Sequence, residues 1–212
     1  AFITLDAAGA RAAAQSADRE LAAGRWRGRL HGIPVAHKDL FDTDGVRTTY
    51  GSKFFRDHMP TRDAEVVRRL KTNGAVSLGK LNLHEFAAGS TSNNPWYGPA
   101  RNPWDTTRSA GGSSGGSGSA VAAFLCAGTT GTDTGGSIRN PAACNGIVGL
   151  KPTNGRVSLA GCYPLCASLD TAGPLARTVR DAAILLQAMA GFDPGDPNSV
   201  NASVPDYLAS IE

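Results

Sequence analysis

The chain has 212 residues, of which 41% are hydrophobic and 18% are charged, and its formal net charge is +3. This composition is ordinary for a globular protein and too apolar for a disordered chain. Lysine and arginine form no extended stripe, so we expect no direct nucleic-acid partner. The sequence contains no run of 18 apolar residues, so we also expect no membrane span.

The cysteines and the first residues indicate the compartment. Residues 1–6 lack the basic segment and cleavage site of a signal peptide. The four cysteines are too few for a disulfide framework, and no second metal-ligand pair follows Cys162 and Cys166. His84-Glu85 lacks the second histidine of a zinc-binding helix. We therefore expect buried, reduced thiols in a cytoplasmic protein that has neither metal nor other cofactor.

The first half of the chain alternates between helix and strand patterns. Residues 6–23 are rich in alanine and predict a helix, and residues 33–38 predict a short strand. Residues 63–73 form an amphipathic helix pattern, which a buried strand over residues 75–78 follows. This alternation predicts an α/β fold with largely parallel strand pairing.

The second half is richer in loops. We expect a long, functional loop over residues 90–108 and a tightly buried helix over 113–127. A glycine- and threonine-rich loop over 128–136, a strand over 147–150 and a helix over 178–190 follow. The tail over residues 193–212 has no core pattern of its own. No internal repeat is present, so the pattern predicts a single domain over residues 1–212.

The 26 glycines concentrate between Gly111 and Gly161, in two glycine-serine loops over residues 111–117 and 131–139. Such segments are often linkers, but linkers do not continue into apolar helices as these loops do. Glycines leave backbone N–H groups accessible, and N–H groups that converge on an oxyanion contribute about 2.7–4 kcal/mol each. These loops are therefore the place to look for catalysis.

The α/β-hydrolase triad is excluded for the motif in the first loop, whereas a His-Asp-Ser order stays open although no histidine has a recognisable catalytic context. Residues 111–115 match the nucleophile motif G-x-S-x-G, which requires a histidine later in the chain. All four histidines lie upstream: His31, His37, His58 and His84. Residues 74–80 resemble a phosphate-binding loop, but Leu81 stands where a magnesium-binding hydroxyl is required.

A serine nucleophile without histidine needs another base, and a desolvated lysine can serve. Lysine must lose about 3.4 pKa units, or about 4.6 kcal/mol, to be half neutral at pH 7. Lys38 follows one apolar strand and Lys80 follows another, so burial can lower the pKa of either. Lys151 is a third candidate. The residue pattern alone leaves this choice open.

The two loops and several other segments resemble the amidase signature family. The resemblance covers nearly the whole chain, and the doubled glycine-serine loop is its most specific part. The segments that carry it are residues 32–39, 79–82, 97–104, 111–161 and 168–174.

The resemblance implies an amidohydrolase that cleaves carboxamides through a Ser–cis-Ser–Lys triad and an acyl-enzyme. It places the nucleophile at Ser137, the serine after a cis peptide at Ser113 and the base at Lys38. The 24-residue separation of the two serines agrees with the family pattern. The resemblance also implies a central mixed β-sheet with helices on both faces. The predicted oxyanion hole and substrate pocket consist of the backbone N–H groups of Thr134, Gly135, Gly136 and Ser137, together with Ala87.

Three points stay open at this level. Arg139 either pairs with Asp133 as scaffold or reaches a substrate carboxylate, and we assign Lys80 and Lys151 to structure. Family members are about twice as long, so we expect a domain that is incomplete at both ends. One interpretation is a stand-alone amidase for a small-molecule amide, either as a monomer or as a homodimer. Another is the amidase subunit of a glutamine-dependent tRNA amidotransferase, which works with partner subunits. A third interpretation is a catalytically incompetent fragment.

Overall fold

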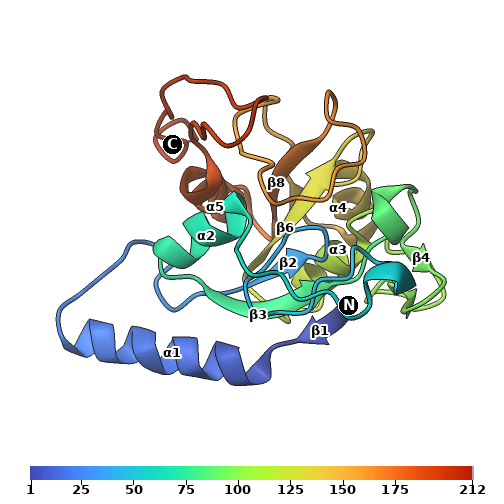
Figure 1. Cartoon of the computed structure of the whole chain (residues 1–212), viewed down its shortest axis with the longest axis horizontal. Helices are drawn as coiled ribbons and strands as arrows, with labels where there is room; N and C mark the ends of the chain where they lie inside the picture. Colours follow the sequence, from blue (N-terminus) through green and yellow to red (C-terminus); the bar gives the residue numbers. More distant parts are fainter. Residues whose placement is uncertain (212) are drawn as a thin grey trace.

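The computed structural model describes residues 1–211, and a six-stranded sheet forms its centre (Figure 1). In spatial order, the strands are β1 (Phe2–Leu5), β3 (Val76–Leu81), β2 (Pro34–Lys38), β6 (Gly128–Asp133), β8 (Thr171–Ala176) and β7 (Val148–Gly149). Strand β2 runs parallel to β3 and β6, whereas the pairs β1–β3, β6–β8 and β7–β8 are antiparallel. The sheet is therefore mixed.

The expectation of largely parallel pairing was wrong for the outer part of the sheet. The helix–strand alternation that suggested it is real between β2 and β3, which flank α2 (Glu65–Thr72). A helix crossover of this kind joins parallel neighbours. Beyond β6 the chain no longer alternates regularly, and β8 returns antiparallel after a long loop.

Helices cover both faces of the sheet. On one face, Ala36 and Leu81 pack against α3 (Gly115–Ala122), and Leu175 packs against α4 (Arg139–Asn145). On the other face, Val35 belongs to the main core, to which α2 and α5 (Val179–Met189) contribute their apolar sides. Because successive side chains of a strand point to opposite faces, neighbouring residues of β2 enter different cores. This architecture confirms the expected α/β fold.

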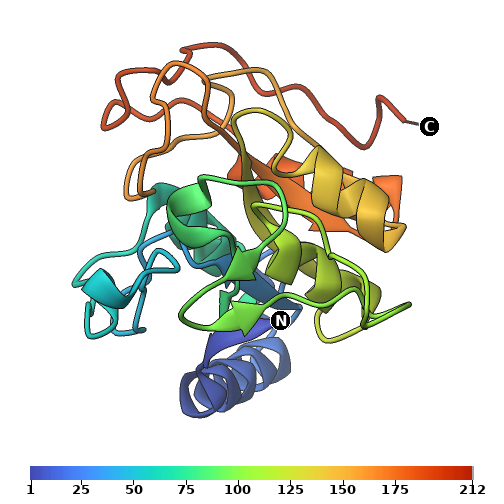
Figure 2. The same ribbon diagram turned by 90° about the vertical axis from the view of Figure 1, so that its right-hand side faces the viewer.

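Helix α1 (Ala7–Ala22) lies at the margin of the molecule in both ribbon views (Figures 1 and 2). Its alanines favour the helix, and Asp6 caps it by accepting a hydrogen bond from the N–H of Gly9 at 3.0 Å. Only Ala10 and Ala17 are buried, where the helix packs along β3. The packing of α1 on the sheet is therefore limited to a few small side chains.

Residues 128–136, expected to be a loop, contain the central strand β6. Every residue of β6 is buried although none is a large apolar residue. A Cβ atom on Gly128 would lie 2.4 Å from Leu185 Cδ1, and one on Gly131 would lie 2.7 Å from Leu175 Cδ1. Neighbouring leucines thus fill the space above the glycines, a contribution to the core that hydrophobic periodicity does not detect.

The connecting segments include short elements. The long loop over residues 90–108 contains a small hairpin of β4 (Asn93–Asn94) and β5 (Gly98–Pro99), and two 3-10 turns are η1 (Lys53–Phe55) and η2 (Glu85–Ala87). All four cysteines are free, but only Cys126 is buried, and Cys144 is exposed. Burial of all four thiols was therefore a wrong expectation. Within residues 1–211, none of the helices has the length and apolar character that a membrane crossing requires.

Candidate active site

The side chain of Lys38, at the end of β2, is fully buried. Its Nζ donates a hydrogen bond to Ser113 Oγ at 2.6 Å and another to Thr132 Oγ1 at 2.7 Å. Strand β6 supplies Thr132, and Ser113 lies just before α3, on the sheet face that Ala36 and Leu81 share with this helix. The fold thus brings together a lysine and a serine that are 75 positions apart in the sequence.

Burial lowers the pKa of Lys38 from 10.5 to about 7, because a charged ammonium loses its hydration there. The carboxylates of Asp133 and Asp170 oppose this shift, since negative charge favours the ammonium. A pKa near 7 makes both protonation states available at neutral pH, which is what a lysine base needs.

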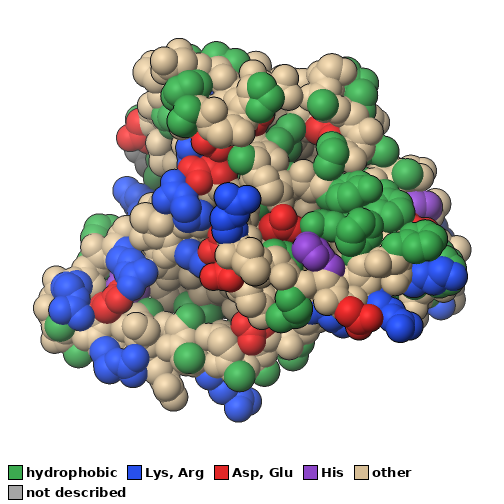
Figure 3. Space-filling model, in the orientation of Figure 1, with side chains coloured by type: hydrophobic (Ala, Val, Ile, Leu, Met, Phe, Trp, Pro, Cys, Tyr) green, Lys and Arg blue, Asp and Glu red, His purple; other side chains and the backbone are tan. Residues whose placement is uncertain are grey.

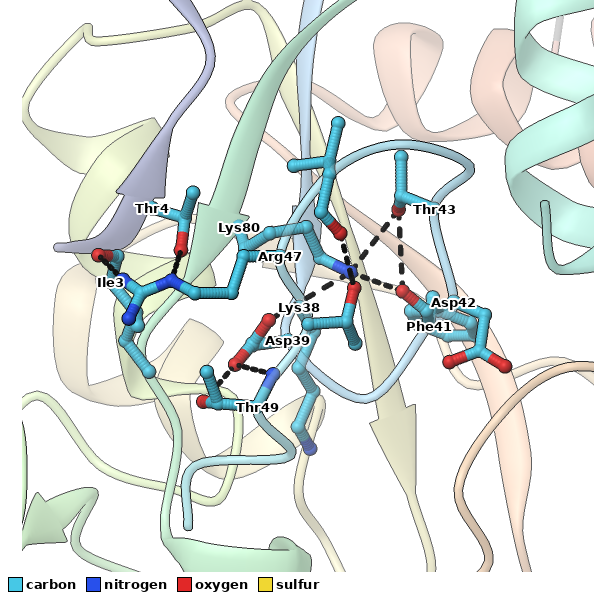
Figure 4. A network of polar contacts seen from close by, with 12 residues as sticks. Ile3, Thr4, Lys38, Asp39, Phe41, Asp42, Thr43, Arg47, Thr49 and Lys80 are labelled. Carbon is cyan, nitrogen blue, oxygen red and sulfur yellow. Dashed lines mark hydrogen bonds and ion pairs between the residues drawn. The ribbon is translucent and has the colours of Figure 1, made fainter. Parts of the chain in front are cut away.

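The other buried lysine, Lys80, points away from this site. In the β2–β3 ladder Lys80 pairs with His37, whereas Lys38 pairs with Leu81, so the two lysines lie on opposite faces. Figure 4 shows the Lys38 side chain extending away from the contacts of Lys80. Lys80 Nζ donates to the Phe41 carbonyl oxygen, to Thr43 Oγ1 at 3.1 Å and to Thr48 Oγ1 at 2.9 Å.

The surroundings of Lys80 are those of a structural charge. Its Nζ lies 3.8 Å from Asp39 Oδ1, and the other oxygen of Asp39 accepts hydrogen bonds from the N–H and hydroxyl groups of Thr49 (Figure 4). Burial lowers the pKa of Lys80 to about 8, and Asp39 limits this shift. Burial and the charge of Lys80 lower the pKa of neighbouring His37 to about 3, which keeps this histidine neutral.

Ser113 begins the turn that leads into α3. The Gly112–Ser113 peptide bond is cis, and the carbonyl oxygen of Ser113 accepts hydrogen bonds from Ser92 Oγ at 3.0 Å and from the N–H of His84 at 3.1 Å. The Gly112 N–H donates to Asn140 Oδ1 at 3.0 Å. These contacts hold the backbone of the turn on both sides of the serine.

Ser137 ends the second glycine-rich loop and lies beside the first. Its carbonyl oxygen accepts a hydrogen bond from the Ser114 N–H at 3.2 Å, which joins the two loops directly. Residues 134–137, here called the oxyanion loop after the role predicted for them, turn around the carboxylate of Asp133. This carboxylate accepts from the Gly136 N–H at 2.8 Å and from the Ile138 N–H at 3.1 Å.

One backbone N–H group of the oxyanion loop is bonded within the loop region, and others are left without an acceptor among the described residues. The N–H of Gly136 serves the loop itself, whereas those of Gly135 and Ser137 meet no acceptor within residues 1–211. Gly136 has φ +133°, a backbone conformation that side-chain-bearing residues rarely adopt. Free N–H groups at a turn of this kind can stabilise developing negative charge.

Arg139 binds Asp133 through two hydrogen bonds, from Nε at 3.0 Å and from Nη2 at 2.9 Å. Although burial acts in the opposite direction, the bonds from Arg139 and from backbone N–H groups hold the pKa of Asp133 below its ordinary value. Of the two roles expected for Arg139, the structure contains the scaffold pairing. Lys151 is bound to the Pro152 carbonyl oxygen and to Asn154, away from both serines.

A cavity of about 410 Å³ opens over the oxyanion loop. Among the described residues, its lining contains no charged side chain. The lining residues are Ala87, Ala88, Gly89, Ser90, Gly112, Thr134, Gly135, Gly136, Ser137, Asn140 and Leu165. Every residue expected at the oxyanion hole or pocket thus lies on one cavity, whereas Lys38 and Ser113 are buried beside it.

An aromatic cluster positions Ala87 at this cavity. Phe86 stacks on Tyr163 with ring centroids 5.1 Å apart, and its N–H donates to the Tyr50 carbonyl oxygen at 2.9 Å. Tyr50 also packs edge-on against Phe55. Hydrophobic side chains gather on one side of the face shown in Figure 3. These contacts fix η2, whose backbone at Ala87 has φ +61°.

The sequence prediction missed three polar residues of this site. Thr132 contacts Lys38, Asn140 lines the cavity, and Asp170 accepts a hydrogen bond from the Thr134 hydroxyl. Each is an ordinary hydroxyl, amide or acid in a glycine-rich or loop segment, so only its proximity in the fold reveals it. Within residues 1–211, no cluster of histidine, cysteine and acidic side chains is arranged to hold a metal ion.

Comparison with known proteins agrees with this geometry. A family model described as amidase matches residues 1–211. The chain belongs to the amidase family. It is 56% identical over 210 residues to a glutamyl-tRNA(Gln) amidotransferase subunit of Halorhodospira halophila, covering 99% of this chain and 43% of the relative. The corresponding subunit of Azoarcus sp. is 54% identical over 211 residues, again over 43% of its length.

Solved structures of amidases share the fold. The peptide amidase of Stenotrophomonas maltophilia superposes with a TM-score of 0.94 at 45% identity, over 100% of this chain and 45% of that one. The corresponding glutamyl-tRNA(Gln) amidotransferase subunit of Thermotoga maritima gives a TM-score of 0.82 at 48% identity, over 84% and 39% of the two chains. This amidase chain thus spans less than half the length of the relatives it matches.

Proposed function

We propose that the protein is a serine amidohydrolase in which Ser137 attacks a carboxamide, Ser113 relays the proton and Lys38 is the base. The observation that carries the proposal is the 2.6 Å contact between buried Lys38 and Ser113, on a loop that is hydrogen-bonded to Ser137. Membership of the amidase family and the likeness to a peptide amidase support the same reaction class.

The proposed reaction has two stages. In the first, Ser137 Oγ bonds to the amide carbon, its proton passes to Ser113 Oγ, and the Ser113 proton passes to neutral Lys38 Nζ. The N–H groups of Gly135 and Ser137 stabilise the oxyanion. The proton returns through Ser113 to the leaving nitrogen, which departs as ammonia or an amine. In the second stage, water attacks the acyl carbon and gives its proton through Ser113 to Lys38, and the bond to Ser137 Oγ breaks as the relay returns a proton to that oxygen.

Labelling with a fluorophosphonate probe tests this assignment in the full-length protein. The probe is expected to modify Ser137, as mapped by mass spectrometry, in the wild type but not in Ser137→Ala. Labelling is expected to be strongly slowed in Lys38→Ala, because the nucleophile then lacks its base. An adduct on another serine, or unchanged labelling of Ser137→Ala, would contradict the proposal. Complete lack of labelling in the folded wild type would favour an incompetent scaffold.

Two substrate classes fit the reaction. The relatives named as glutamyl-tRNA(Gln) amidotransferase subunits favour a glutaminase that works with partner subunits. The peptide amidase neighbour favours a stand-alone enzyme for small amides. Hydrolysis of free amides by the isolated protein would select the second class, whereas glutaminase activity that requires partner subunits would select the first.

The free thiols support the cytoplasmic location expected from the sequence.

A further inference from the structure

Asp170 connects the oxyanion loop to Leu165, a second segment that lines the cavity. The residue lies just before β8 and is 8% exposed. Its Oδ1 accepts a hydrogen bond from the Thr134 hydroxyl, and its Oδ2 accepts from the N–H of Leu165 at 2.8 Å and of Cys166 at 2.9 Å. Both Thr134 and Leu165 line the cavity. One carboxylate thus fixes two sides of the same site.

We propose that Asp170 is a positioning residue of the amide-cleaving reaction, which holds the oxyanion loop and Leu165 in place at the cavity. The inference rests on the proposed function. The inference gives Asp170 a role in this reaction although its carboxylate transfers no proton in the proposed relay.

The contacts of Asp170 are those of a hydrogen-bond acceptor. Both oxygens act as acceptors, for one hydroxyl and two backbone N–H groups, and among the described residues no basic side chain forms an ion pair with Asp170. An asparagine could still accept from Thr134. Its amide nitrogen would then face the N–H groups of Leu165 and Cys166, donor against donor. Replacement by asparagine therefore removes the charge and releases one wall of the cavity.

The charge of Asp170 reaches the proposed base. The titratable groups whose charges act on the pKa of Lys38 are Cys162, Asp133 at the end of β6 and Asp170 before β8. The charge of Asp170 raises the pKa of Lys38 against the larger effect of burial. Removal of this charge is expected to lower that pKa further, which moves the acid limb of the activity profile to lower pH. A purely structural role for Asp170 would leave the midpoint of that limb unchanged.

The closing experiment uses the full-length protein, with any partner subunits that it requires. It measures the rate of fluorophosphonate labelling at Ser137 from pH 5 to 9, together with kcat and KM for an amide substrate. The variants are Asp170→Asn, Thr134→Val and their combination. Asp196→Asn is the matched control, because this 6% exposed carboxylate also anchors a loop, through the N–H of Leu159 at 2.8 Å, but does not act on Lys38.

We expect kcat to fall by about 10- to 100-fold in Asp170→Asn and in Thr134→Val, with KM changed by less than about threefold, since misplacement of about 1 Å can cost 10²-fold. The double variant should be slower than either single variant, because Asp170→Asn loses the contacts to Leu165 and Cys166 whereas Thr134→Val breaks the bond to the oxyanion loop. The acid limb should move to lower pH only where Asp170 is replaced. Asp196→Asn should keep both the rate and the limb of the wild type.

The outcomes separate the two proposals. Absence of labelling in the folded wild type overturns the proposed function and this inference with it. Wild-type labelling with an unshifted acid limb or an unchanged rate in Asp170→Asn overturns only the inference. If Asp170→Asn does not fold, Thr134→Val decides, because it retains the carboxylate and removes only the hydroxyl: a wild-type rate in this variant would overturn the positioning role.

Discussion

The clearest prediction concerns the pH dependence of Ser137 acylation. Burial places the pKa of Lys38 at about 7 instead of 10.5. At pH 7, about half of the Lys38 side chains are neutral, against about one in 3,000 for an ordinary lysine. Burial thus increases the competent fraction about 1,600-fold. Below the pKa, the acylation rate should fall tenfold for each pH unit, which amounts to about 50-fold between pH 7 and pH 5.

The assay is the second-order rate of fluorophosphonate labelling at Ser137 between pH 5 and pH 9. The rate should rise with unit slope up to about pH 7 and less than double above it. Lys151→Met serves as the control and should keep the wild-type profile, because its hydrogen bonds within residues 1–211 go to Pro152 and Asn154 in its own loop. A rate that stays flat down to pH 5 would refute the reasoning, as would a limb centred near pH 10.

The same shift predicts a stability effect of known sign. Because the folded pKa of Lys38 lies below the unfolded one, the unfolded chain binds more protons between about pH 7 and pH 10.5. Stability should therefore rise with pH through this window, by as much as about 4.8 kcal/mol, relative to Lys38→Met. Urea denaturation of both proteins at several pH values measures it. Parallel curves for the two proteins would show that the Lys38 pKa is not depressed.

Three substitutions test the scaffold, each by urea denaturation. Arg139→Ala should lower the urea midpoint, since buried Asp133 loses its ionic partner, and the loss should become smaller at acidic pH, where that carboxylate is protonated. Lys80→Met should cost about 3–5 kcal/mol by leaving Asp39 buried without a counter-charge, and adding Asp39→Asn should recover part of it. Gly136→Ala should cost about 1–3 kcal/mol, because alanine resists φ +133°; an unchanged midpoint would contradict the backbone geometry.

The sequence predicted the first half of the fold better than the second. Strand β2 and helix α2 lie where the apolar patterns placed them, because each buries apolar side chains of its own. Strand β6 was missed because its core contacts come from leucines on other elements that pack against its glycines. The hydrophobic pattern of one segment does not reveal side chains from other segments that fill the core next to it.

The candidate site shows a similar division. The glycine-serine loops and the need for a lysine were inferred from the residues themselves. The roles of Thr132 and Asp170 were not, because a threonine or an aspartate in a loop has no distinctive pattern until the fold places it next to Lys38 or Thr134. The choice between Lys38 and Lys80 needed the family resemblance, since both residues follow apolar strands.

The contacts of the two lysines explain physically why that choice favours Lys38. A hydroxyl both donates and accepts hydrogen bonds. When Lys38 loses its proton, Ser113 can reverse its bond and donate to the amine, so the buried group stays satisfied in both states. Lys80 donates to the carbonyl oxygen of Phe41, which can only accept, and lies 3.8 Å from a carboxylate oxygen of Asp39. Deprotonation of Lys80 would leave the buried carboxylate of Asp39 without its counter-charge, so Lys38 is better placed than Lys80 to exchange a proton at low cost.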